Sequence, residues 1–100
     1  IEPNDLQAWL SAVVCLTLSG QPDRALGELD RLVREHPEAS GQAAVHARYA
    51  EVNTRLGRAD LARRHASEAI QKAREPMDLP LDWAVPHDLR DRIPPHLRAR

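Results

Sequence analysis

The histidines and the single cysteine are the residues of this sequence best suited to bind a metal ion or to act as a nucleophile. The five histidines include no pair at the three- or four-residue spacing that places two zinc ligands on one face of a helix. His46 and His65 fall on different predicted helices. His36 is expected to interact with the negative end of the helix that Pro37 terminates. We therefore predict no metal site.

Cys15 lies within the apolar run from Ala12 to Leu16 and has no neighbouring base, so we predict a buried, unreactive thiol. A single cysteine excludes a disulfide within the chain and fits both the cytoplasm, the default expectation, and the periplasm. The sequence shows no paired carboxylates, no glycine-rich phosphate loop and no Ser–His arrangement. These absences predict a protein that is not an enzyme, with no catalytic residue and no cofactor.

Charged residues of both signs are mixed along the chain. Lys and Arg number 14 and Asp and Glu number 15, for a net charge of −1. The Arg63-Arg64 pair lies between Asp60 and Glu68, a pattern typical of a solvated helix face. We therefore predict no nucleic-acid partner, and no apolar run approaches the roughly 20 residues that span a bilayer. Lys72 is the single lysine, a bias that we attribute to a GC-rich bacterial gene.

Two glycine-centred turns indicate how the helices are connected. In each turn the glycine is followed by Asp after three residues and by Ala after five. The interval from Gly20 to Gly57 is 37 residues. A turn that recurs at one interval, between segments with helical periodicity, predicts a repeated pair of antiparallel helices.

Four main helices are predicted around these turns, each opened by a polar cap or a proline and ended by glycine or proline. The second pair is rich in alanine, which buries little apolar area, and is predicted to be the less stable pair alone. The first three helices are predicted from Asn4 or Asp5 to Leu18, from Pro22 to His36, and from Ser40 (as the cap) to about Leu56. The fourth is predicted to carry Leu61 to Ala73 and to stop at Glu75-Pro76.

The segment after Pro76 differs in composition from the rest of the chain. Four further prolines, at positions 80, 86, 94 and 95, prevent a long helix. One short helix is predicted near 83–93, beginning at Trp83 or at Pro86. Trp83 and Leu89 are expected to cover the exposed end of the second helical pair, and His96 to Arg100 are expected to fray.

The first helical pair resembles the tetratricopeptide repeat, a helical hairpin of 34 residues. Trp9 stands at the family's tryptophan position, and Gly20 and Ala25 occupy the turn and the following helix. Pro37 closes the unit, 34 residues after Pro3.

The second pair matches the family less closely, because His46 stands at the tryptophan position and Asn53 where an aromatic is usual. The 37-residue interval requires about three extra residues, which we place in the linker 38–42.

The resemblance implies an all-α solenoid fragment with hairpins at about 5–37 and 40–75, within residues 1–76, followed by the proline-punctuated segment 77–100. Ile1-Glu2-Pro3 looks like the end of a preceding repeat, so a longer parent protein is expected. In this family the first helix of each hairpin lines a concave face that binds peptides or partner helices. A protein-interaction scaffold is therefore implied. On this chain that face comprises Gln7, Leu10, Val14, Thr17, Leu18, Ala44, Ala47, Glu51, Thr54 and Arg55.

Other interpretations stay open beside this one. The same face would also serve to contact a neighbouring repeat or the C-terminal segment, and an open end of the stack would allow self-association. The chain would equally suit a non-catalytic positioning part of a larger bacterial enzyme or of a secretion or assembly protein. Some family members grip C-terminal carboxylates with basic and amide residues. Leu10 and Val14 stand at those positions here, which argues against such a ligand.

Overall fold

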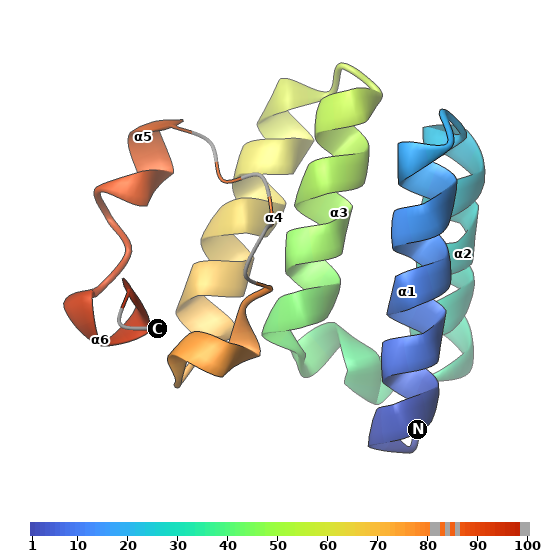
Figure 1. Ribbon diagram of the computed structural model, residues 1–100, viewed down its shortest axis with the longest axis horizontal. Helices are drawn as coiled ribbons and strands as arrows, with labels where there is room; N and C mark the ends of the chain where they lie inside the picture. The colour runs from blue at the N-terminus through green and yellow to red at the C-terminus, as the bar shows by residue number, and fades with distance from the viewer. Residues whose placement is uncertain (81–82, 84, 86, 99–100) are drawn as a thin grey trace.

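The computed structural model describes residues 1–80, 83, 85 and 87–98. These residues form helices and turns, with no strand among them, which confirms the predicted all-α fold with four main helices (Figure 1). The elements are α1 (Pro3–Leu18), α2 (Pro22–Glu35), the 3-10 helix η1 (Pro37–Gly41), α3 (Ala43–Arg55), α4 (Ala59–Lys72), the 3-10 helix η2 (Pro76–Asp78), α5 (His87–Arg90) and α6 (Pro95–Arg98).

The four main helices form two hairpins in succession. Helices α1 and α3 run in the same direction, and α2 and α4 return in the opposite one (Figure 1). Helix α1 packs against α2 and α3, α2 also packs against α3, and α3 packs most extensively against α4. The first helices of the two hairpins therefore lie side by side.

Both hairpin turns have the same backbone structure. Gly20 and Gly57 adopt φ values of +80° and +75°, in the left-handed region that glycine reaches without strain. In the first turn, the Gln21 N–H donates to the Leu16 carbonyl at 2.9 Å and the Gly20 N–H donates to the Thr17 carbonyl at 3.3 Å. This is the Schellman arrangement that satisfies the last carbonyls of a helix. The second turn closes with the equivalent bonds, from Arg58 to Asn53 (2.8 Å) and from Gly57 to Thr54 (3.1 Å).

Alanine substitutions at two glycines should therefore have effects of opposite sign. Gly20→Ala is expected to lower the free energy of unfolding by about 1 kcal/mol, because alanine is strained at positive φ. Gly27 lies in the interior of α2, where an added Cβ meets nothing within 4 Å. Gly27→Ala is expected to raise the free energy of unfolding by about 0.5–1 kcal/mol. Urea denaturation measures both changes, and shifts of the same sign would contradict this account.

Two helix starts differ from those predicted. Helix α1 begins at Pro3 with Glu2 as its N-cap residue, ahead of Asn4 and Asp5. Proline suits the first helical position because it needs no hydrogen-bond acceptor there and its φ is already helical.

Ser40 does not cap α3, whose N-cap residue is Gln42. Ser40 belongs to η1, and its hydroxyl donates to the Pro37 carbonyl at 2.8 Å. Element η1 occupies the linker in which the extra residues of the 37-residue interval were placed.

Two clusters of buried apolar side chains hold the helices together. The first core joins α1, α2, η1 and α3, and is built mainly from leucine and valine. Its buried members are Leu10, Val13, Ala25, Leu29, Leu32, Ala39, Val45, Tyr49 and Val52.

The second core joins the alanine-rich faces of α3 and α4 to the segment that follows α4. Its buried members are Ala43, Ala47, Ala50, Ala66, Ala69, Ala73, Leu79, Trp83, Leu89 and Leu97.

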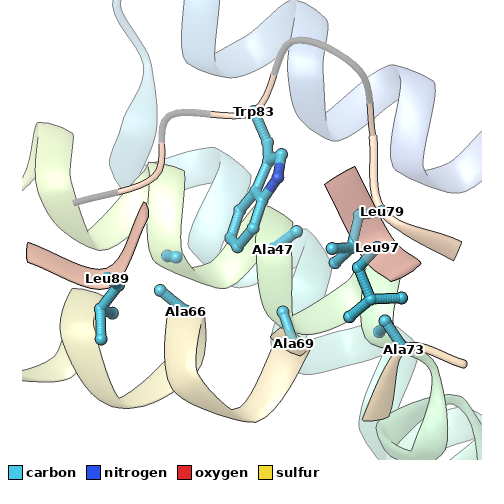
Figure 2. Packing of buried hydrophobic residues seen from close by; sticks show 10 residues of the cluster. Ala47, Ala66, Ala69, Ala73, Leu79, Trp83, Leu89 and Leu97 are labelled. Carbon is cyan, nitrogen blue, oxygen red and sulfur yellow. The ribbon is translucent and has the colours of Figure 1, made fainter. Parts of the chain in front are cut away.

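The C-terminal segment covers the side of the second hairpin that faces away from α1 and α2 (Figure 1). Figure 2 shows Trp83 and Leu89 directed toward the alanines of α3 and α4, as predicted. The large side chains fill the space that small alanine side chains leave open. The second hairpin thus lies between two apolar surfaces, that of α1 and α2 on one side and that of the C-terminal segment on the other.

The sequence predicted one short helix near 83–93, and the helix found there is shorter than that. Helix α5 spans only His87–Arg90, and Trp83 lies outside it. The alternative start at Pro86 lies outside the described residues. The expectation of a frayed end from His96 is wrong for residues 96–98, which belong to α6. The reason is Leu97, which is only 6% exposed because it packs near Leu79 and Ala73 (Figure 2). Arg100 lies outside the described residues.

Candidate functional site

A groove runs along the line where α1 and α3 lie side by side. It consists of two hollows that both border on Val14 and Arg48. The upper hollow, of about 80 Å³, lies between the C-terminal halves of the two helices. The lower hollow, of about 580 Å³, lies between the N-terminal half of α1, the start of α3 and residues 77–80. We refer to the two hollows together as the α1–α3 groove.

Most of the residues predicted for the concave face line this groove. Thr17 and Leu10 are largely buried and form its floor, and the Thr17 hydroxyl donates to the Val13 carbonyl at 2.8 Å. Ala47 does not line the groove, because it is fully buried in the second core. The predicted residues of the upper hollow are Val14, Thr17, Leu18, Glu51, Thr54 and Arg55, and those of the lower hollow are Gln7, Leu10, Val14 and Ala44.

Arg48 lies at the junction of the two hollows and was missed in the sequence-based prediction. Its position follows from helical spacing, because it comes four residues after Ala44 and three before Glu51 on the same face of α3. Met77, Asp78 and Pro80 form the third wall of the lower hollow. No local pattern marks these three residues, since their place depends on where the chain passes after α4.

The groove combines an apolar lining with charges of both signs. Arg48 Nη1 lies 2.5 Å from Glu51 Oε1, and both side chains are mostly buried. Asp78 Oδ2 accepts hydrogen bonds from the backbone N–H groups of Arg74 (2.8 Å) and Glu75 (3.0 Å). These bonds lower the pKa of the Asp78 carboxyl from its ordinary value. The carboxylate is therefore ionised at neutral pH and fixes the turn that forms the third wall.

The prediction of a buried thiol at Cys15 is wrong. Cys15 is exposed and borders the lower hollow. Successive helical residues turn by about 100°, so Cys15 points away from Val13, which is fully buried two residues earlier. The apolar run around Cys15 therefore does not all face the core.

The histidines lie closer together than their sequence spacing suggests. His46 on α3 and His65 on α4 face each other, with 3.1 Å between their Nδ1 atoms. Within the described part of the chain, no group of three or more His, Cys, Asp or Glu side chains is arranged to hold a metal ion. His36 is the C-cap residue of α2, where its N–H donates to the Leu32 carbonyl. Its ring lies 3.6 Å from Glu38.

Comparisons of the chain with protein-family models, with curated proteins and with solved structures found no match. The likeness to the tetratricopeptide repeat therefore rests on the residues quoted above. Over residues 1–80, 83, 85 and 87–98, no helix has both the length and the apolar character needed to cross a bilayer.

Proposed function

We propose that this chain is a protein-interaction module of the tetratricopeptide type, which binds an extended peptide or a partner helix in the α1–α3 groove. The observation that carries the proposal is the groove itself. It is bordered by the first helix of each hairpin and contains most of the residues projected onto the concave face. A repeated pair of hairpins is well suited to this role, because stacking them creates an elongated surface on one side.

The lining of the groove favours a ligand with apolar side chains. Leu6, Leu10 and Val14 supply apolar surface along α1. Among the described residues, three large apolar side chains are exposed, and two of them border the groove: Leu18, 69% exposed, and Met77, 75% exposed. Exposed apolar side chains that gather around one hollow are typical of a binding surface.

The charges near the groove would set the orientation of the ligand. Arg55 is exposed in the upper hollow, whereas Asp78 borders the lower one. A peptide lying along the groove would therefore meet a positive group at one end and a negative group at the other. Charges at the edge of an apolar site chiefly select the partner and its direction.

Val14→Arg tests the proposal, because Val14 borders both hollows and a long charged side chain there would fill the groove. We expect peptides selected from a phage-displayed random library on the unmodified protein to bind the variant at least about tenfold more weakly. Ala12→Arg places the same side chain on an exposed position of α1 outside the groove lining and should leave the affinity unchanged. Fluorescence anisotropy with labelled peptides measures both affinities. Equal affinities for the two variants would contradict the proposal.

A further inference from the structure

His46 is buried at the junction of the two hairpins, and both of its ring nitrogens have a polar neighbour. Its Nε2 lies 2.7 Å from the Ser40 carbonyl oxygen in η1. Its Nδ1 lies 3.1 Å from the Nδ1 of His65 on α4. A carbonyl oxygen only accepts hydrogen bonds, so the proton of neutral His46 lies on Nε2. The Nδ1 of His46 is then an acceptor, and the Nδ1 of His65 must donate to it.

This hydrogen-bonded chain accommodates one added proton but not two. A first proton goes to the Nε2 of the half-buried His65, which leaves its Nδ1–H donating to His46. A second proton must go to the Nδ1 of His46. Two N–H groups would then face each other across 3.1 Å, on two positively charged rings. Like charges at this separation repel strongly where little water intervenes.

The histidine pair is connected to the first hairpin by Tyr49. The Tyr49 ring stacks on the His65 ring, with 4.6 Å between centroids and 13° between planes. The Tyr49 hydroxyl donates to the Asp30 carboxylate on α2 at 2.7 Å. Burial, followed by the bond to Asp30, raises the pKa of the Tyr49 hydroxyl, which therefore remains a donor. Through Tyr49 and Ser40, the pair is connected to α2 and η1 as well as to α3 and α4.

We propose that His46 and His65 form a pH-sensitive latch that holds α4 and the linker η1 on α3, closed while the pair holds at most one added proton and opened by the second. The latch is separate from the α1–α3 groove, since neither histidine borders either hollow. Opening would release α4 from His46 and the linker η1 from α3. The expected result is a looser second hairpin and a looser attachment of the linker η1 to it.

The charges around the pair have opposing effects on its protonation. Glu68 Oε2, which also pairs with Lys72, lies 3.9 Å from His46 Nε2 and favours a proton. Asp30 acts in the same direction, whereas Arg64 opposes it. The pKa of His65 is lowered, chiefly by burial and next by the charge of His46. His65 therefore binds its proton less readily in the folded chain than in the unfolded chain, in which a histidine titrates near about 6.5. The contribution of His65 to stability is full above about pH 6.5 and falls as the pH is lowered through it.

Histidine ring resonances in NMR spectra of the full chain test the latch directly. At about pH 7.5, we expect His46 to be the Nε2–H tautomer. On acidification, addition of the second proton to the pair should coincide with shifts of backbone amides in α4 and η1, the two elements that the latch holds on α3. The latch is wrong if both rings become protonated and the amides of α4 and η1 do not respond.

His65→Phe supplies a second test, because phenylalanine keeps the stacking on Tyr49 but does not titrate. In the unmodified chain, the unfolding equilibrium constant should rise as the pH falls from about 6.5 to about 5, by at most about tenfold per pH unit for each proton. In His65→Phe this rise should be reduced, whereas His96→Phe, at an exposed site, should retain it in full. Urea denaturation at each pH measures the constants. An undiminished rise in His65→Phe would overturn the proposal.

Discussion

Trp83→Ala is expected to lower the free energy of unfolding by about 3–5 kcal/mol, the usual cost of removing a large aromatic side chain from a core. Trp83 is only 7% exposed and lies over the alanine faces of α3 and α4 (Figure 2). Alanine buries little area by itself, so the second core depends on the few large side chains that the C-terminal segment supplies. Among the residues that the structure describes, no other member of that core has an aromatic ring.

The measurement for Trp83→Ala is urea denaturation combined with amide hydrogen exchange. Exchange should accelerate first in α4, because this helix packs chiefly against α3 and shares the second core with the C-terminal segment. Met77→Ala is a suitable control, since Met77 belongs to the same segment but its side chain is 75% exposed. The control should change the free energy of unfolding by less than about 0.5 kcal/mol. If both variants were equally stable, the C-terminal segment would not be the cover of the second hairpin.

Leu29→Ala should lower the free energy of unfolding by about 2–5 kcal/mol through loss of packing in the first core. Leu29 lies on α2 and is fully buried in the cluster that joins the first hairpin to α3. The surrounding helices cannot close the cavity completely, because α2 packs against both α1 and α3. The substitution therefore removes apolar contacts on both sides of α2.

Leu18→Ala is the matched control for Leu29→Ala, because it makes the same chemical change at a side chain that is 69% exposed. Its expected effect on the free energy of unfolding is below about 0.5 kcal/mol. Thermal denaturation and urea denaturation should both find Leu18→Ala more stable than Leu29→Ala. A loss in Leu18→Ala comparable with that in Leu29→Ala would contradict the assignment of Leu29 to the core.

The hairpins were predictable from the sequence because their signals are local. Gly20 and Gly57 stop the preceding helix by reaching positive φ, and Pro22 starts the next helix at its first position. The start of α3 was not predictable in this way. The Ser40 hydroxyl bonds to the Pro37 carbonyl, an acceptor that comes within reach only once η1 has folded. The Ser40 hydroxyl could either cap α3 or bond to the Pro37 carbonyl, and the surrounding structure decides between these two hydrogen bonds.

The residues that line the groove were predictable from the sequence only where their spacing along a single helix places them on the same face. The exposed positions of α1 and α3 follow from helical spacing, as does the omitted Arg48. The wall at Met77 and Asp78 depends on how the second core directs the chain after α4. The contact between His46 and His65 depends on the rotation of α3 against α4, which spacing within either helix does not specify.

The most direct test of the central claim, that the α1–α3 groove binds a peptide or a partner helix, is a map of bound peptide on the isotopically labelled chain. Peptides selected from the random library would be titrated into the protein while backbone amide shifts are recorded. We expect the shifts to concentrate in α1, α3 and residues 77–80, and to be absent in Val14→Arg. Shifts confined to α2 and α4, or a library that yields no binding peptide, would contradict the claim.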